Sequence, residues 1–323
     1  YELGDKVRFF RYNRVRIFIQ KIIIFQRIED IMLKEYLQQS KADIESYLSS
    51  VLESPNTEYT KLYESMKYSL LMGGKRIRPI ITKAVIESLG GSWEAYKDVV
   101  CAIELIHTYS LIHDDLPAMD NDDYRRGKLT NHRVYGDGMA ILAGDGLLTY
   151  AFELVSKHTK LSADQVVQII HILAKGAGPS GMVGGQAFDL QSEGKFLPLE
   201  ELVVLHKGKT GALFSAAVEI GLIIMDATTS VREAYLRYAD HLGLLFQITD
   251  DILDVVGTQE ELGKTPGSDE RQHKATYVSI LGLDTAKERA QDVANLALTA
   301  LQDSNCTSPV LEGLVQYLMD RTQ

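Results

Sequence analysis

Residues 232–256 read REAYLRYADHLGLLFQITDDILDVV, and this stretch decides the fold. Its apolar residues recur at spacings of three and four, which places them along one side of a helix with 3.6 residues per turn. They are Tyr235, Ala239, Leu242, Leu245, Phe246, Thr249, Ile252, Leu253 and Val256. The stretch therefore predicts a long helix with one buried face.

The same period continues outward from this stretch. Residues 98–113 repeat it, and we find no convincing alternating strands, hairpin turns or strand–helix alternation. Turn-forming residues predict breaks at 54–56, 90–91, 176–185, 194–198 and 257–267. None of these breaks is long enough to be an obvious linker. We therefore expect an all-α helical bundle in which residues 32–323 form one domain.

Composition narrows the class of protein. The chain has 323 residues, of which 45% are hydrophobic, so it can bury a large core. Its net charge of −10 argues against nucleic-acid binding through overall basic charge. Two cysteines, Cys101 and Cys306, are too few for a disulfide framework and lack zinc-ligand spacing. No uninterrupted apolar run approaches the ~18 residues of a membrane span, so we expect a cytoplasmic protein without stable membrane insertion.

Residues 1–31 differ from the rest of the chain. They contain seven basic and four acidic residues, whereas the whole chain is acidic. Their apolar stretch is interrupted by Gln20 and Lys21, and no small-residue cleavage site follows, which argues against a signal peptide. An amphipathic element attracted to anionic lipid is one interpretation, and an unstructured leader is the one we prefer. Because Met32 begins a regular helical pattern, we expect the functional chain to start there.

Two aspartate clusters follow apolar helices. The first is DDLPAMDNDD at 114–123, and the second is DDILD at 250–254. A helix C-terminus already carries partial negative charge, so each anion there costs ~0.3–1 kcal/mol unless a cation offsets it. Asp250 and Asp254 lie four residues apart on one face, whereas Asp120 can approach Asp114 only if Pro117 reshapes the backbone.

Carboxylates without a histidine or cysteine partner suit a hard ion such as magnesium, whose shell is completed by water and phosphate oxygens. The alternative is that these aspartates are solvated acids at helix ends and in loops. Two clusters of similar placement make that alternative weaker than it is for one. An EF-hand calcium site does not fit, because its ligand spacing and central glycine are missing.

Basic motifs could supply the phosphate side of such a site. They are GGKRIRP at 73–79, RRG at 125–127 and KGKTG at 207–211, together with Lys264 and Lys274. Arginine forks and lysine point charges both bind phosphate. Each motif taken alone also fits a basic surface patch. A nucleotide-binding P-loop is rejected, because the strand and the upstream glycine that it requires are absent before Lys209.

These motifs occur together with ELIH at 104–107, GGQ at 184–186 and QITDD at 247–251. In this combination and order, the chain resembles the trans-prenyltransferases, the short-chain isoprenyl diphosphate synthases, from about Met32 to the C-terminus. The resemblance implies an all-α bundle around a central apolar cavity, and a homodimer. It also implies magnesium-dependent, head-to-tail condensation of isopentenyl diphosphate with an allylic diphosphate such as dimethylallyl or geranyl diphosphate.

The resemblance also implies roles for individual residues. Magnesium would be held by Asp114, Asp120 and Asp250, with Asp115 and Asp254 as direct or water-mediated supporters. The allylic diphosphate would be bound by Arg125, Lys209, Thr210, Gln247 and Lys264. Isopentenyl diphosphate would be bound by Gly74, Lys75, Arg78, His107 and Arg126. Spacing alone favours the role of a buried, hydrogen-bonded histidine for His107, and only the resemblance reverses that preference.

Helix geometry suggests the length of the product. Tyr109 lies five residues before Asp114, roughly 7–8 Å along a helix, and could close the cavity below a growing chain. Ser110, four residues before Asp114, is small enough to let a ten-carbon substrate extend. The chain resembles bacterial farnesyl-forming members of the family, which predicts a fifteen-carbon product. The alternatives are a geranylgeranyl or longer-chain synthase and a non-catalytic subunit of a heteromeric synthase, whereas the second aspartate cluster and the basic residues argue against a terpene cyclase.

Overall fold

The computed structural model describes residues 30–195, 197–257 and 274–320. Helices dominate these ranges, which confirms the all-α prediction. A first helix covers residues 30–51. The others are α2 Thr60–Leu70, α3 Ile77–Ser88, η1 Trp93–Tyr96, α4 Lys97–Asp114, α5 Asn131–Tyr135, α6 Asp137–Ser156, α7 Ala163–Ala177, α8 Met182–Ser192, α9 Leu199–His206, η2 Lys207–Gly211, α10 Ala212–Ile224, α11 Thr229–Val256, α14 Tyr277–Leu281, α15 Leu283–Asp303 and α16 Pro309–Asp320.

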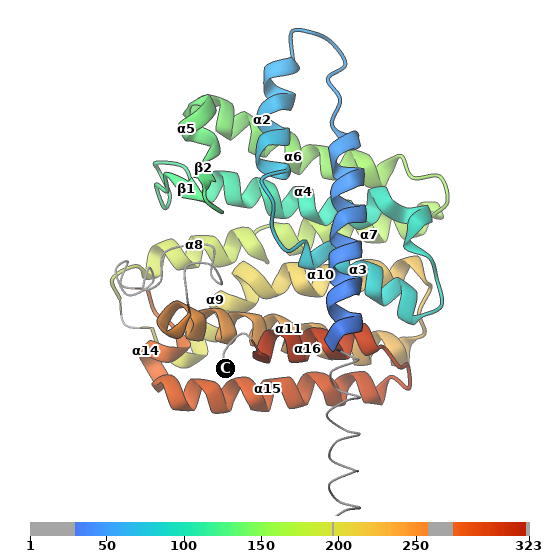
Figure 1. The fold of residues 1–323 in the computed structure, drawn as a ribbon, viewed down its shortest axis with the longest axis vertical. Helices are drawn as coiled ribbons and strands as arrows, with labels where there is room; N and C mark the ends of the chain where they lie inside the picture. Colours follow the sequence, from blue (N-terminus) through green and yellow to red (C-terminus); the bar gives the residue numbers. More distant parts are fainter. Residues whose placement is uncertain (1–29, 196, 258–273, 321–323) are drawn as a thin grey trace, which may run out of the picture.

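The helices lie in layers around α10 and α11 (Figure 1). Helix α10 packs against α3, α7 and α11, while α4 packs against α6 and α11 packs against α15. The first helix and α2 stand across these layers, and the C-terminal helices lie at the lower side of the view (Figure 1). The site described below forms where α4, α8, η2 and α11 end or bend.

Burial explains which helices are central. Helix α10 has the sequence ALFSAAVEIGLII, and ten of its thirteen residues are buried. A helix that is apolar on nearly all sides is stable only when other helices surround it. Helix α15 instead buries one stripe of mostly alanine residues and closes the outside of α11. The apolar surface of each helix therefore determines its place: α10, which is apolar on nearly all sides, is central, and α15, which has one buried stripe, lies outside.

The expected break points are confirmed for the described residues, and α11 begins at Thr229, three residues earlier than predicted. The expectation that the chain lacks hairpins is wrong at one place. Strand β1, Tyr124–Arg125, pairs antiparallel with β2, Lys128–Leu129. Arg126 and Gly127 between them have φ angles of 52° and 74°, as a tight two-residue turn requires. Strands of two residues are too short to show an alternating pattern in the sequence.

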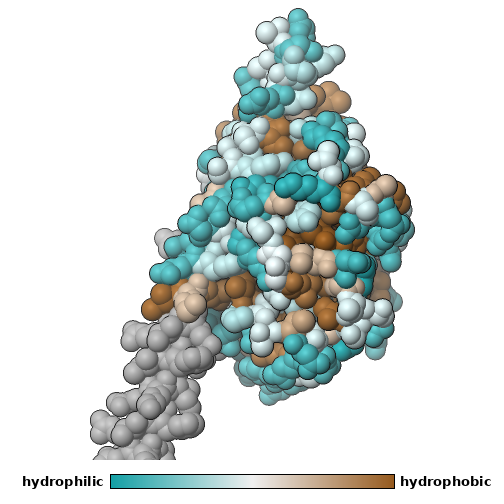
Figure 2. Space-filling view, turned by 90° about the vertical axis from the view of Figure 1, so that its right-hand side faces the viewer, coloured by the Kyte–Doolittle hydropathy of each residue, from teal (hydrophilic) through white to brown (hydrophobic). Residues whose placement is uncertain are grey.

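Helix α6 is long and apolar, with a mean hydropathy of 1.3 over an 18-residue window of which 39% is buried. By length and composition it could cross a membrane, although helices inside water-soluble proteins pass the same test. Asp145 and Glu153 interrupt its apolar sequence, and α4 covers its inner side. The surface elsewhere is mixed: on the face shown in Figure 2, apolar areas interrupt a mainly hydrophilic exterior.

Candidate active site

Asp114 and Asp120 are brought together by the end of α4. The helix stops at Asp114, three residues before Pro117, which cannot continue a helix because it lacks a backbone N–H. The chain then turns back, so that the Asp120 N–H donates a hydrogen bond to the Asp114 carbonyl at 2.9 Å. The turn therefore puts two carboxylates that are six residues apart in sequence at one end of one helix.

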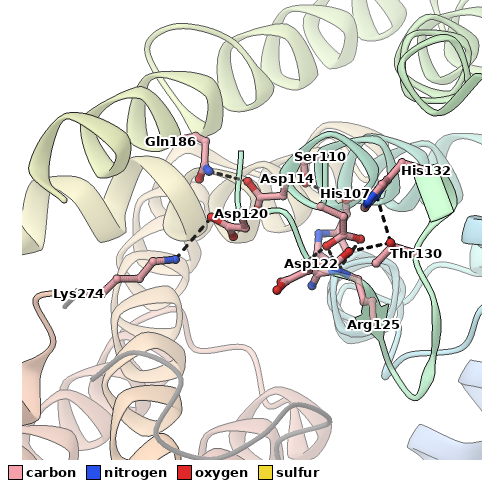
Figure 3. A network of polar contacts seen from close by, with 11 residues as sticks. His107, Ser110, Asp114, Asp120, Asp122, Arg125, Thr130, His132, Gln186 and Lys274 are labelled. Atoms are coloured by element: carbon pink, nitrogen blue, oxygen red, sulfur yellow. Dashed lines mark hydrogen bonds and ion pairs between the residues drawn. The ribbon is translucent and has the colours of Figure 1, made fainter. Parts of the chain in front are cut away.

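This pair of carboxylates is electrostatically costly. Burial raises the pKa of Asp114, and the neighbouring charge of Asp120 raises it further, whereas Lys209 lowers it. Groups from distant parts of the chain offset the cost (Figure 3). The Gln186 amide donates to Asp114 Oδ1 at 2.5 Å, and Lys274 Nζ lies 3.8 Å from Asp120 Oδ1.

Asp115 is held differently from its neighbours. Its side chain is almost fully buried, and Arg125 in β1 donates to it from Nε, to Oδ1 at 2.7 Å and to Oδ2 at 2.9 Å, while Arg125 Nη2 lies 2.6 Å from Oδ1. This ion pair fixes the hairpin to the end of α4. The structure thus pairs two predicted site residues with each other.

Lys209 reaches the site from η2, a turn of π-helix between α9 and α10. Such turns are rare and occur often at functional sites. Helix α8 packs closely against this turn, because Gly185 has no side chain: a Cβ there would overlap the backbone of Lys209. The close approach lets Lys209 Nζ pair with Asp189 Oδ2 at 2.6 Å.

The second aspartate cluster lies on α11 beside η2. Thr210 Oγ1 donates to Gln247 Oε1 at 3.1 Å, and Gln247 Nε2 donates to Asp251 Oδ1 at 2.8 Å. Asp251 Oδ2 accepts the backbone N–H of Tyr277 at 2.8 Å, so both oxygens of this carboxylate are bonded within the protein. Thr210 and Gln247, which were both predicted to bind the allylic diphosphate, therefore contact each other.

Asp250 and Asp254 lie on the same face of α11, four residues apart. Asp250 is half-buried and Asp254 is buried. The predicted ligand Lys264 lies outside the described residues. Within the part of the chain that the structure describes, no three acidic, histidine or cysteine side chains are grouped so as to hold a metal ion by themselves. The carboxylates at the ends of α4 and α11 are the oxygen donors that a hard divalent cation prefers, and they fit magnesium in that respect.

The predicted isopentenyl site includes the loop before α3. Arg126 donates a short hydrogen bond from Nη1 to the Gly73 carbonyl. Gly74 has a φ of 122°, and a Cβ at that position would lie 2.5 Å from the Arg126 guanidinium. The Arg126 side chain could move aside, but the positive φ still favours glycine at this position of the loop.

Arg78 and the histidine His107 complete this predicted site, while Lys75 is exposed. The Arg78 guanidinium lies 5.2 Å from the centre of the Phe214 ring, and its buried Nε has no hydrogen-bond partner among the residues that the structure describes. Burial lowers the pKa of Arg78 to about 10. Burial also lowers the pKa of His107 well below its usual value, and nearby arginines lower it further, so His107 is neutral.

Arg76 corrects our interpretation of GGKRIRP, in which all three cations were candidates for phosphate. Arg76 is buried and donates to Glu104 at 2.8 Å, to Glu45 at 3.2 Å and to the Leu70 carbonyl at 2.7 Å. Its φ of 54° is left-handed, which turns the chain at the start of α3. Arg76 therefore anchors the loop to α4, while Lys75 and Arg78 remain as candidates.

The predicted chain-length residues lie on the buried side of α4. Tyr109 is 6% exposed, and its ring meets the His113 ring edge-on at 5.7 Å between centres. Ser110 Oγ donates to the His107 carbonyl at 2.8 Å. His113 in turn contacts the Ile141 carbonyl of α6 at 3.0 Å. Tyr109 is therefore held in place by a side chain bound to the next helix.

The sequence assigned no role to Asp189, placed Gln186 only within the GGQ motif, and offered Lys274 only as a possible cation on the phosphate side. Gln186, Asp189 and Lys274 each touch a predicted site residue in the structure. Gln186 and Asp189 are three residues apart and therefore share a face of α8. This spacing is the feature of the sequence that could have grouped them as site residues. Lys274 follows residues 258–273, and no sequence spacing relates it to Asp120.

Comparison with known proteins places the chain in a family. The sequence profile described as polyprenyl synthetase matches residues 59–316. A farnesyl diphosphate synthase of Geobacillus stearothermophilus is 48% identical over 293 residues, covering 90% of this chain and 98% of that protein. A geranylgeranyl diphosphate synthase of Cyanophora paradoxa is 49% identical over 261 residues, covering 80% and 86%.

A solved structure agrees with these sequence relatives. The geranyltransferase of Helicobacter pylori, complexed with magnesium and isoprenyl diphosphate, superposes with a TM-score of 0.79 at 35% identity. The match covers 89% of this chain and 96% of that one. The same helical bundle and nearly the same chain length are therefore shared, and the chain belongs to the polyprenyl synthetase family.

Proposed function

We propose that this protein is a magnesium-dependent prenyltransferase that joins isopentenyl diphosphate head-to-tail to an allylic diphosphate and makes mainly farnesyl diphosphate. The observation that carries the proposal is the meeting of Asp114 and Asp120 at the end of α4, with Lys209 close enough to lower the pKa of Asp114. Acidic and basic groups that converge in this way suit a metal-bound diphosphate. Farnesyl diphosphate synthases among the relatives support the product.

The candidate residues would form two anion-binding sites, one for each diphosphate substrate. Asp114, Asp120 and Asp250 would hold magnesium, which neutralises the charge that gathers on a departing diphosphate when it is bound. Lys209, Thr210 and Gln247 would bind the allylic diphosphate. Gly74, Lys75, Arg78 and Arg126 would bind isopentenyl diphosphate near His107, which stays neutral and can donate or accept a hydrogen bond.

The proposed chemistry needs no side-chain nucleophile. The allylic carbon–oxygen bond breaks to give pyrophosphate and an allylic cation, and the double bond of isopentenyl diphosphate forms the new carbon–carbon bond. The carbon framework then loses a proton, which passes to pyrophosphate. The protein binds both diphosphates, aligns the reacting carbons and excludes water, which would capture the cation.

Tyr109 supports a product of limited length. Its buried ring lies about 7–8 Å from Asp114 along α4 and is fixed against His113. A ring in this place would limit chain growth, and the farnesyl-forming relatives support a limit of fifteen carbons. Geranylgeranyl diphosphate synthase is the second candidate, because a relative of that name is as similar as the farnesyl-forming one.

We also propose a cytoplasmic homodimer. Helix α6 exposes Ile141 and Leu142, which are 44% and 53% exposed, although its composition is that of a buried helix. A second copy of the chain would cover this face, so that the apolar side chains of α6 would be buried without contacting lipid. The expectations that residues 32–323 form the catalytic domain, that residues 1–31 stand outside it and that no nucleic acid is bound remain predictions.

One incubation tests the proposed function. Purified protein is mixed with magnesium, labelled isopentenyl diphosphate, and dimethylallyl or geranyl diphosphate, and the products are separated by chain length. We expect mainly farnesyl diphosphate from both allylic substrates, and none when a chelator is added. Mainly twenty-carbon product would favour the geranylgeranyl alternative. A protein without activity would instead fit the non-catalytic subunit.

A further inference from the structure

We propose that Asp189 is the resident counter-ion of Lys209, which gives up the lysine to an incoming diphosphate and takes it back when pyrophosphate leaves. The inference rests on the proposed function and deepens it, because it assigns α8 a part in product release. Asp189 is a positioning residue in this scheme: it acts through Lys209 and does not ligate the metal.

The geometry of α8 supports this exchange. Gln186 and Asp189 are three residues apart and share a face, and Gly185 lets that face approach η2. Gln186 binds Asp114 while Asp189 binds Lys209 at 2.6 Å. One helix therefore holds a predicted metal ligand with a neutral amide and a predicted phosphate ligand with a charged carboxylate.

The charges around Lys209 show why a counter-ion is useful. Burial lowers the pKa of Lys209, but Asp114, Asp189 and Asp120 raise it more, so the net shift is upward and the ammonium stays charged. Asp114 and Asp120 would be occupied by magnesium in the loaded enzyme. Asp189 then remains as the carboxylate that can neutralise Lys209 once the diphosphate has gone.

The ion pair is suited to exchange because it is accessible. The Lys209 side chain is 26% exposed and that of Asp189 is 17% exposed, so a ligand in the site can reach the lysine. A diphosphate carries several negative charges, whereas the carboxylate carries one, so the diphosphate wins while it is bound. The carboxylate competes again as pyrophosphate departs, which lowers the affinity for this product.

The test compares Asp189→Asn with the parent chain in magnesium-dependent binding of inorganic pyrophosphate, measured by calorimetry. Asparagine keeps the shape of the side chain and removes the competing charge. We expect pyrophosphate to bind about fivefold more tightly, the value for loss of one partly exposed ion-pair competitor. In turnover, KM for the allylic diphosphate and kcat should both fall. Glu193→Gln, which removes one charge from the exposed end of the same helix, should change neither quantity.

A double-variant cycle separates this role from a structural one. In a Lys209→Ala background, Asp189→Asn should no longer tighten pyrophosphate binding, because its effect passes through the lysine. Weaker or unchanged binding by Asp189→Asn alone, in a protein with the circular dichroism spectrum of the parent, would overturn the inference and leave the proposed function standing. If the parent chain itself binds no magnesium pyrophosphate, the proposed function fails and the inference falls with it.

Discussion

At the scale of single residues, the charged groups of the site are already paired with one another. Asp115 is bound by Arg125, Lys209 by Asp189, and Asp120 lies near Lys274. Removing such groups from water without partners would cost several kcal/mol each. Ligand binding is therefore an exchange of partners, and the measured affinity reflects the difference between two sets of contacts.

The chain-length residues give the first prediction. Tyr109→Ala removes the ring that would block the chain, so the main product should shift from fifteen to twenty carbons or more. Ser110→Phe adds a ring one residue nearer to the metal, so the main product should shorten to ten carbons. Product analysis by chromatography measures both shifts. An unchanged distribution of product lengths in both variants would show that Tyr109 and Ser110 do not limit the length of the growing chain.

A buried histidine gives a prediction about pH and stability. Burial lowers the pKa of His206 to about 3, whereas an unfolded histidine titrates near 6.5. Between these values the unfolded chain binds one proton more than the folded chain. The contribution of His206 to the free energy of unfolding is therefore fully present above pH 6.5 and falls by about 1.4 kcal/mol per pH unit below it.

Urea unfolding at pH 7.5, 6.0 and 5.0 measures this loss. His206→Gln should flatten the decline below pH 6.5 by up to about 1.4 kcal/mol per unit. His171→Gln, which removes an exposed imidazole, serves as the control and should follow the parent curve. Equal slopes for all three proteins would show that His206 takes up its proton without unfolding.

The sequence could predict the acidic residues of the site, but not their partners. Asp114 and Asp250 stand out because acids at the ends of apolar helices are unfavourable without a cation. Arg76 shows the limit: beside Lys75 and Arg78 it looks like a third phosphate ligand, yet it lies buried against Glu104. Which of three neighbouring cations turns inward depends on the packing of α3 against α4, and no spacing in the sequence records that.

At the scale of elements, the approach of α8 to η2 decides whether the site assembles. Gly185→Ala would place a Cβ against the Lys209 backbone, which cannot rotate away as a side chain could. We expect at least 1–3 kcal/mol of lost stability, as in other overpacked sites, and a large loss of kcat. Gly138→Ala, in the first turn of α6 with open space around it, is the control. Thermal unfolding and steady-state turnover distinguish the two variants. Normal turnover in Gly185→Ala would show that the two elements can separate without harm.

The anchor of α3 gives a prediction of the same kind. Arg76→Ala leaves Glu104 buried without its cation, so the free energy of unfolding should fall by about 3–5 kcal/mol. Arg133→Ala breaks an ion pair with Asp123 in which both side chains are about half exposed, and it should cost no more than about 1 kcal/mol. Denaturant unfolding compares them. Equal losses would mean that Arg76 does not stabilise the start of α3.

Long helices could be predicted, whereas short or irregular elements could not. Helices α4 and α11 bury apolar residues over many turns, so their period is visible in the sequence. The hairpin has two residues in each strand, and the π-helical turn at Lys207–Gly211 has five residues in all. Neither spans enough residues to establish a period, and both owe their form to the helices packed around them.

At the scale of the whole molecule, the exposed apolar side chains on the outer side of α6 remain to be explained. Its inner side packs against α4, which carries Tyr109 and Asp114, so a partner on its outer side would also brace the site. Val134 of α5 continues the apolar surface, with 44% exposure. A second copy seated on this surface would give one interface made from the same patch on both subunits.

The oligomeric state tests that interface directly. Leu142→Glu puts a charge in the middle of the exposed side of α6, and burying an unpaired carboxylate between two subunits costs several kcal/mol. We therefore expect a dimer for the parent chain and a shift to monomer for the variant in sedimentation velocity at micromolar concentration. Val167→Glu, on the exposed side of α7, alters a similarly exposed apolar residue away from this face and should leave the dimer intact. A dimer that survives Leu142→Glu would place the interface elsewhere. A monomeric parent would leave the outer face of α6 without the partner we propose.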